Sequence, residues 1–134
     1  MFKLLKCMNG RQSVGEPALL PATPGETYAF GEALVLSAGK LTKCGPTAKP
    51  THICGVNYVA PATDPEAIPC VAVAPNMVFE TVIGAAPASL TVGAVVTIAA
   101  DGLGVTATTT SGVATIHNLL GATAAGDAVE VVFK

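Results

Sequence analysis

The stretch FGEALVLSAGKLT, residues 30–42, decides the fold, because it predicts two short apolar strands joined by a tight turn at Ala38-Gly39-Lys40. A second stretch, VGAVVTIAADGLGVT at residues 92–106, has the same pattern and turns at Asp101-Gly102. Further apolar segments recur at an offset of about 61 or 62 residues: 52–56 and 67–73 in the first half, 112–116 and 128–133 in the second. The chain therefore predicts two tandem β modules of similar design.

The composition favours thin, tightly packed sheets over a protein with a deep aromatic pocket. Of 134 residues, 51% are hydrophobic, but only 4% are aromatic and 12% are charged. An ordinary soluble domain carries about 25% charged residues. So little charge on a small body indicates that part of its surface is covered by neighbouring molecules.

The expected fold class is all-β, with two small barrel-like or sandwich-like modules that duplicate each other, preceded by an extended N-terminal arm. Residues 1–28 form the arm, in which residues 2–7 can be a strand and Pro17, Pro21 and Pro24 forbid a helix. Such a segment either lies on the body or reaches out to a partner by strand addition. Residues 29–75 form the first module, and residues 76–134 form a bridging strand and the second module, in one compact body with the first.

Smaller features complete this expectation. Loops are expected at residues 44–50 and 60–65, and the bridging strand at 76–83, where apolar residues alternate. One short helical turn is expected at residues 119–125, although Gly121 and Gly126 weaken it.

Charge is distributed unevenly along the chain. Lys3, Lys6 and Arg11 precede any acidic residue, whereas residues 51–133 contain acidic residues and no Lys or Arg. A basic arm on an acidic body is expected to dock on another protein or on a neighbouring subunit; the alternative is a solvated leader. The absence of a basic patch and of aromatic surface on the modules argues against a nucleic-acid partner.

A membrane span is rejected, although residues 81–100 carry no charge. Pro87, Gly84 and Gly93 interrupt this segment, and its alternation is typical of strands. Residues 1–6 have a basic start but no apolar core of signal-peptide length, so no signal peptide is expected.

The residues that carry chemistry form no recognisable site. Cys7, Cys44, Cys54 and Cys70 lie 37, 10 and 16 residues apart, which fits no metal-binding knuckle, and His52 with Cys54 and Cys44 is the nearest set of ligands. A disulfide pair remains open, but reduced, buried thiols are favoured. Asp101 and Asp127 beside glycines are typical of turns. We expect no enzyme, no metal and no cofactor.

The hairpin GEALVLSAGKLT at residues 31–42, the segment KPTHICG at 49–55 and the strand IPCVAV at 68–73 resemble the small head-decoration (capsid cement) proteins of tailed bacteriophages. Those proteins carry a similar G-x-x-L-x-L-x-x-G-K-L hairpin and close with an alternating Val-rich strand, here residues 128–133. The resemblance covers residues 28–134 and is one of pattern and composition.

The resemblance implies β-barrel or β-tulip domains on the outer capsid surface of a virion, made in the bacterial host cytoplasm. It implies trimers that clamp neighbouring major capsid protein subunits, with an N-terminal arm that adds to the capsid strands and no membrane partner. The residues expected to contact the capsid or a neighbouring subunit are Phe2, Lys3, Leu4, Leu5, Lys6, Arg11, Leu19 and Leu20.

A second function remains open, namely a virion spike, fibre-base or carbohydrate-binding module that contacts a host surface through residues 106–111. Sugar-binding proteins usually present Trp or Tyr platforms, and this chain has no Trp and two Tyr.

Overall fold

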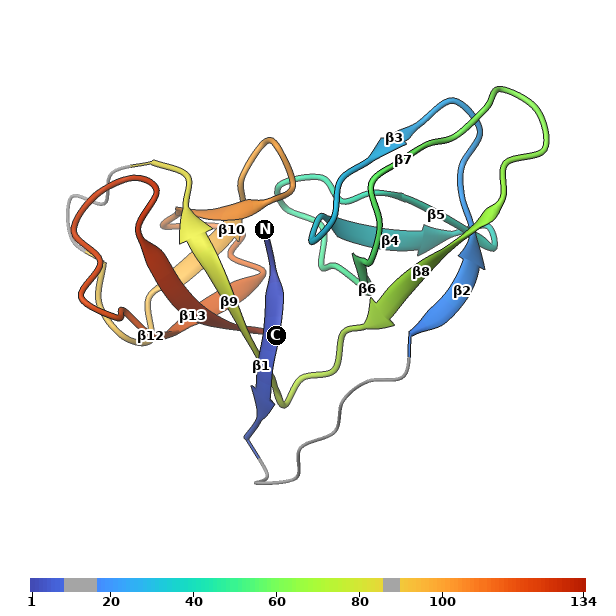
Figure 1. Cartoon of the computed structure of the whole chain (residues 1–134). Helices are drawn as coiled ribbons and strands as arrows, with labels where there is room; N and C mark the ends of the chain where they lie inside the picture. Colours follow the sequence, from blue (N-terminus) through green and yellow to red (C-terminus); the bar gives the residue numbers. More distant parts are fainter. Residues whose placement is uncertain (9–16, 86–89) are drawn as a thin grey trace.

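The structure is a computed structural model that describes residues 1–8, 17–85 and 90–134 (Figure 1). Within these ranges the backbone forms β-strands and turns and no helix, so the fold is all-β as expected. The same residues contain no helical segment of the length and apolar character needed to cross a bilayer.

The first sheet has five strands in the order β2-β8-β6-β4-β5, all antiparallel to their neighbours. A parallel bridge between Ala22 and Leu41 brings the end of β2 back to β5. A two-stranded ribbon lies beside this sheet and pairs β3 with β7. The bounds are β2 Ala18–Pro21, β3 Thr27–Tyr28, β4 Ala33–Ser37, β5 Lys40–Lys43, β6 His52–Cys54, β7 Tyr58–Val59 and β8 Ala67–Ala72.

The second sheet has six strands, five of which close into a barrel because β9 pairs with both β13 and β11. The barrel runs β9-β13-β12-β10-β11, and β1 is added to the free part of β9. The bounds are β1 Lys3–Cys7, β9 Met77–Ile83, β10 Val95–Ile98, β11 Gly104–Ala107, β12 Ala114–Asn118 and β13 Ala128–Phe133.

The strands of the orders β2-β8-β6-β4-β5 and β9-β13-β12-β10-β11 correspond one to one. Corresponding strand pairs run in the same relative direction and have the same register. For example, the pair Leu34↔His52 of the first sheet corresponds to Val96↔Ala114 of the second. Each path also ends in a parallel contact between its first and last strands. The two halves therefore use one pairing scheme.

Local turn chemistry explains the two hairpins. Ala38 and Gly39 both have positive φ, 48° and 77°, which is the geometry of a two-residue hairpin turn that matches the twist of the strands. Gly102 has φ 71° in the equivalent turn of the second sheet. The helical turn expected at residues 119–125 is wrong, because Leu120 and Gly121 have φ 53° and 80° and reverse the chain instead.

The described parts of residues 1–28 lie on the body of the protein, which is one of the two placements open from the sequence. These parts separate: β1 pairs with β9 of the second sheet, whereas β2 pairs with β8 of the first. Both ends of β1 are fixed, because Phe2 N–H donates to Gly31 O at 2.8 Å and Met8 N–H donates to Asn76 O at 2.8 Å. The N-terminal segment is thus an integral part of both sheets.

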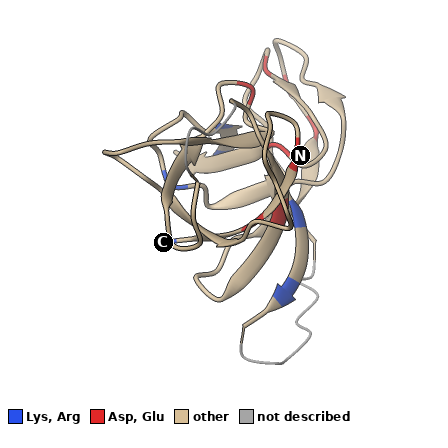
Figure 2. Ribbon diagram, turned by 90° about the vertical axis from the view of Figure 1, so that its left-hand side faces the viewer, with Lys and Arg blue, Asp and Glu red and all other residues tan. Residues whose placement is uncertain are grey.

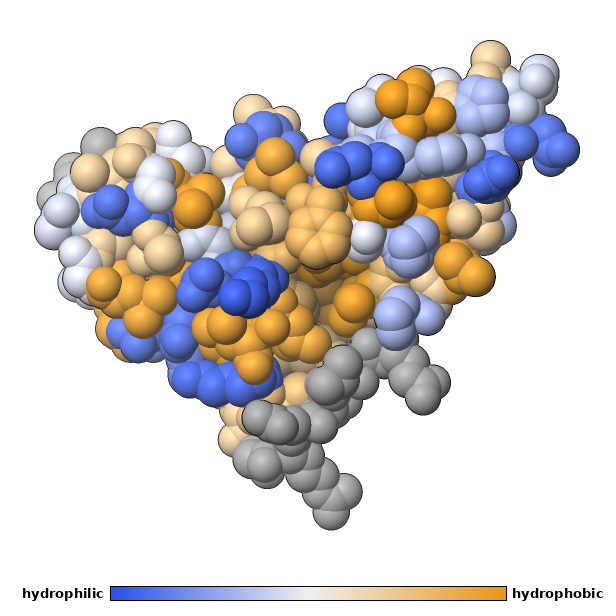
Figure 3. All heavy atoms as spheres, viewed as in Figure 1, coloured by the Kyte–Doolittle hydropathy of each residue, from blue (hydrophilic) through white to orange (hydrophobic). Residues whose placement is uncertain are grey.

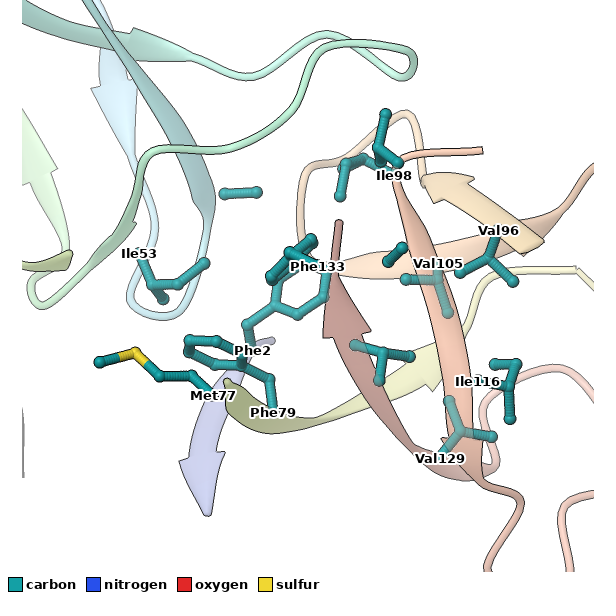
Figure 4. Packing of buried hydrophobic residues seen from close by; sticks show 14 of the residues in the cluster. Phe2, Ile53, Met77, Phe79, Val96, Ile98, Val105, Ile116, Val129 and Phe133 are labelled. Carbon is teal, nitrogen blue, oxygen red and sulfur yellow. The ribbon is translucent and has the colours of Figure 1, made fainter. Parts of the chain in front are cut away.

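One hydrophobic core spans the two sheets. Ile53, Ala33 and Cys44 of the first half join the cluster inside the barrel, and Figure 4 shows Ile53 facing the rings of Phe2 and Phe133. Backbone hydrogen bonds support this junction: Ala33 N–H donates to Gly102 O at 2.9 Å and Ile98 N–H to Pro46 O at 3.0 Å. A smaller cluster around Tyr28 and Leu41 fills the first sheet alone.

We predict that Gly102→Ala destabilises the protein more than Gly39→Ala. Both glycines have positive φ, so each alanine should cost about 1 kcal/mol. A Cβ at Gly102 would also lie 2.8 Å from Cγ of the buried Glu32, whereas the space around Gly39 is open. Urea unfolding should give a cost of about 2 kcal/mol or more for Gly102→Ala. Equal costs would contradict the close packing at this junction.

Candidate interaction surface

Phe2, which the sequence analysis selects as a contact residue, lies in the hydrophobic core of the chain. Its side chain is 2% exposed, and its ring lies 5.4 Å from that of Phe133, which lies at the same distance from Phe79. Leu4 packs against the same cluster from the next inward position of β1. Two apolar residues of the expected arm, Phe2 and Leu4, therefore pack against the core of the barrel.

The lysines of β1 lie near acidic residues of the same chain, and one of them forms an ion pair. Lys3 lies opposite Glu80, and Lys6 Nζ lies 3.6 Å from Glu130 Oε2. Glu80 and Glu130 are themselves opposite each other on β9 and β13, an arrangement of like charges that is destabilising without compensation. Figure 2 shows basic and acidic residues side by side here. Lys3 and Lys6 of the basic segment thus lie beside acidic residues of their own chain.

The outer edge of β1 is poorly suited to bind another strand. The β1–β9 register shifts between Leu4 and Lys6, so Leu5 is the extra residue of a bulge and is exposed. Lys3 and Lys6 are also exposed. Bulges and lysines on an edge strand are features that prevent further pairing.

Among the described residues, no strand pairs with the outer edge of β2, residues Ala18–Pro21, and we call it the β2 edge. Gly55 N–H donates to Pro69 O at 2.8 Å, so the polar groups of Pro69 face β6. Leu19 lies opposite Pro69 on the other side, and by the alternation of an antiparallel ladder its N–H and C=O point away from β8. No described residue bonds to them.

The equivalent edge of the barrel is covered. Leu19 occupies the position that Glu80 holds on β9, and Glu80 pairs with Lys3 of β1. Within the described residues no strand lies on Leu19 in the same way. Its side chain is 69% exposed. The β2 edge therefore combines unpaired backbone groups with an exposed leucine, although Pro21 lacks an N–H and keeps the available pairing short.

A small hollow lies between β1 and the first sheet. Its volume is about 140 Å³, and its lining includes Phe2, Leu4, Phe30, Ile53 and Val71. Figure 3 shows apolar side chains gathered on this face. Pockets for small organic ligands usually measure about 300–1,000 Å³, so this hollow fits one inserted side chain better than a metabolite.

The other predicted residues are dispersed. Leu20 is half-buried against the core of the first sheet, and Arg11 lies outside the described residues. Phe30, which is 52% exposed at the rim of the hollow, is not among the residues selected from the sequence. Its placement depends on the turn at Gly31, where φ is 78°.

Burial disfavours the charged forms of Cys44 and His52. Burial raises the pKa of the Cys44 thiol to about 11 and lowers the pKa of His52, so both are neutral at pH 7. In the part of the chain that the structure describes, no three His, Cys, Asp or Glu side chains are grouped to hold a metal ion.

Comparison with models of protein families and with curated proteins finds no match to this sequence.

We predict that Phe2→Ala destabilises the protein by about 3–5 kcal/mol, because it removes a buried ring from the base of the barrel. The control is Leu5→Ala on the same strand, which should change stability by less than about 0.5 kcal/mol because Leu5 is exposed. Urea unfolding of both variants tests this. A Phe2→Ala protein as stable as Leu5→Ala would show that β1 is a dispensable arm.

Proposed function

We propose that this protein is a head-decoration protein of a tailed bacteriophage. It binds the outside of the capsid and stabilises the shell by cementing neighbouring major capsid subunits, as a trimer on the capsid. The observation that carries the proposal is the β2 edge, where Leu19 offers an unpaired N–H and C=O beside an exposed apolar side chain. Such an edge binds an extended segment of a partner by strand addition.

The surface of the protein is suited to large contacts that are repeated over a shell. A standard interface takes about 800 Å² from each partner, about an eighth of the 6758 Å² that this chain exposes. Large apolar side chains are exposed on several strands and turns, among them Leu19, Phe30, Val59 and Val92. With 12% charged residues, the surface has few groups that would be costly to desolvate in a shell contact.

We further propose that the two halves arose by internal duplication, with the shared pairing scheme and the recurrent sequence pattern as support. A duplicated chain presents two equivalent strands, β9 of the barrel, which β1 covers, and β2 of the first sheet, on which no described strand lies. In this proposal the covered edge stabilises the body, and the β2 edge is used for the capsid.

A host-surface module is a weaker candidate. Aromatic side chains that stack on sugars must be accessible, and Tyr28 is buried with its O–H donating to Leu41 O. Tyr58 stacks on Tyr28 with ring centroids 6.5 Å apart, and its hydroxyl accepts from Glu66 N–H. Both tyrosine side chains are therefore held by contacts within the first half of the chain.

The abundance of the protein in purified particles tests the virion assignment. We expect a ratio near one copy per major capsid subunit, or one per few, when quantitative mass spectrometry compares the two proteins. A handful of copies per particle would favour a spike or fibre-base protein. Absence from particles would refute the proposed function.

The role of the β2 edge is tested by Leu19→Pro. Proline removes the outward N–H, but it breaks no bond to β8, because that N–H faces away from the sheet. We expect Leu19→Pro to lose binding to capsids that lack the protein, while its thermal unfolding stays close to that of the parent.

Leu19→Thr is the matched control, because it keeps the N–H and removes most of the apolar side chain. It should weaken binding less than Leu19→Pro if backbone pairing dominates. Full binding by Leu19→Pro would show that the capsid does not use this edge.

A further inference from the structure

Two cysteines face each other across neighbouring strands of the first sheet. Cys54 on β6 is the register partner of Cys70 on β8, and both side chains are buried in the same core cluster, with 2% and 0% exposure. Cys7 and Cys44 have no cysteine as register partner. The pairing therefore singles out one of the possible cysteine pairs.

The hydrogen bonds of β6 show whether Cys54 and Cys70 are a hydrogen-bonded or a non-hydrogen-bonded pair of the antiparallel ladder. Cys54 N–H donates to Glu32 O at 2.9 Å, and Cys54 O accepts from Gly31 N–H at 2.8 Å, so both polar groups face β4. On the β8 side the bond at 2.8 Å is made by the next residue, from Gly55 N–H to Pro69 O. Cys54 and Cys70 are thus a non-hydrogen-bonded antiparallel pair.

This kind of pair brings two side chains close enough for a covalent bond. Non-hydrogen-bonded partners have Cα atoms about 4.5 Å apart, which lies within the range of about 4.4–6.8 Å found across disulfides. Both thiols are on the core face of the sheet. At present Cys54 Sγ donates to Val56 O and Cys70 Sγ to Ala18 O, so bond formation requires only that the side chains rotate toward each other.

We propose that Cys54 and Cys70 form an intramolecular cross-strand disulfide when the protein meets a small-molecule disulfide as oxidant. The two thiols lose two protons and two electrons, one S–S bond forms between the Sγ atoms, and the oxidant is reduced to two thiols. The product ties β6 to β8, the strand that carries the β2 edge. This inference is independent of the proposed function.

Burial determines when the bond forms. Desolvation raises the pKa of both thiols, and the neighbouring Cys54 raises the pKa of Cys70 further, so few thiolates exist in the folded protein. The bond therefore forms as the first sheet assembles or opens, and it is enclosed afterwards. The corresponding pair in the barrel is Ile116↔Val131, so the two sulfurs occupy an ordinary core position.

The experiment is refolding of the reduced full chain from urea into a buffer of reduced and oxidised glutathione. We expect a mass loss of about 2 Da and protection of Cys54 and Cys70 alone from alkylation after unfolding. Glu66 lies between the two cysteines in sequence. Cleavage after glutamate without reduction should therefore leave two peptides joined by the disulfide, which reduction separates.

A parallel oxidation in urea separates native geometry from chain proximity. Cys44 and Cys54 are 10 residues apart and Cys54 and Cys70 are 16 apart, so loop closure in the unfolded chain favours the first pair. The preference should switch to Cys54–Cys70 only on refolding. Cys44→Ala should keep the link and Cys70→Ala should lose it. A refolded protein that stays fully reduced, or the same mixture of pairs in both conditions, would overturn the proposal.

Discussion

The structure depends on β9, a strand that is hydrogen-bonded along both edges. One edge pairs with β13, and the other is divided between β1 at its start and β11 at its end. This division closes the barrel, because the parallel contact with β11 joins its first and last strands. The pairing of β9 with β13 also places Glu80 opposite Glu130. The lysines of β1 lie near these two carboxylates and offset the repulsion between them. Without β1, the start of β9 would lose its strand partner and Glu130 would lose its ion pair with Lys6.

The two sheets share a pairing scheme and differ in how their first strands are covered. β1 lies on β9, whereas within the described residues nothing lies on the corresponding part of β2. Exposed strand edges favour association with other chains. This asymmetry, more than any single side chain, supports the proposed capsid contact. It also explains why Leu19 is exposed while its counterpart Glu80 is partly covered.

Much of the strand inventory could be predicted because its signals are local. The turns at Ala38-Gly39 and at Gly102 require positive φ, which glycine adopts at little cost, and the flanking apolar residues alternate. Other predictions failed where the deciding contact is distant in sequence. Phe2 was selected as a contact residue of the arm, but its ring packs on that of Phe133, far along the chain. Leu19 and Leu20 were equivalent in the sequence, and only the pairing with β8 decides which of them faces outward.

By itself, the sequence determined the all-β class, the positions of the hairpins and the recurrence of one pattern in both halves. These features follow from local backbone conformations and from the alternation of side chains along a strand, both of which depend on residues that are neighbours in the sequence. Only the tertiary structure decided that the N-terminal segment is divided between two sheets, that Lys3 lies opposite Glu80, and that Cys54 lies opposite Cys70. Register between strands far apart in the chain is fixed by closure of the whole sheet and by burial of its inner face, and no local stretch of sequence contains that information.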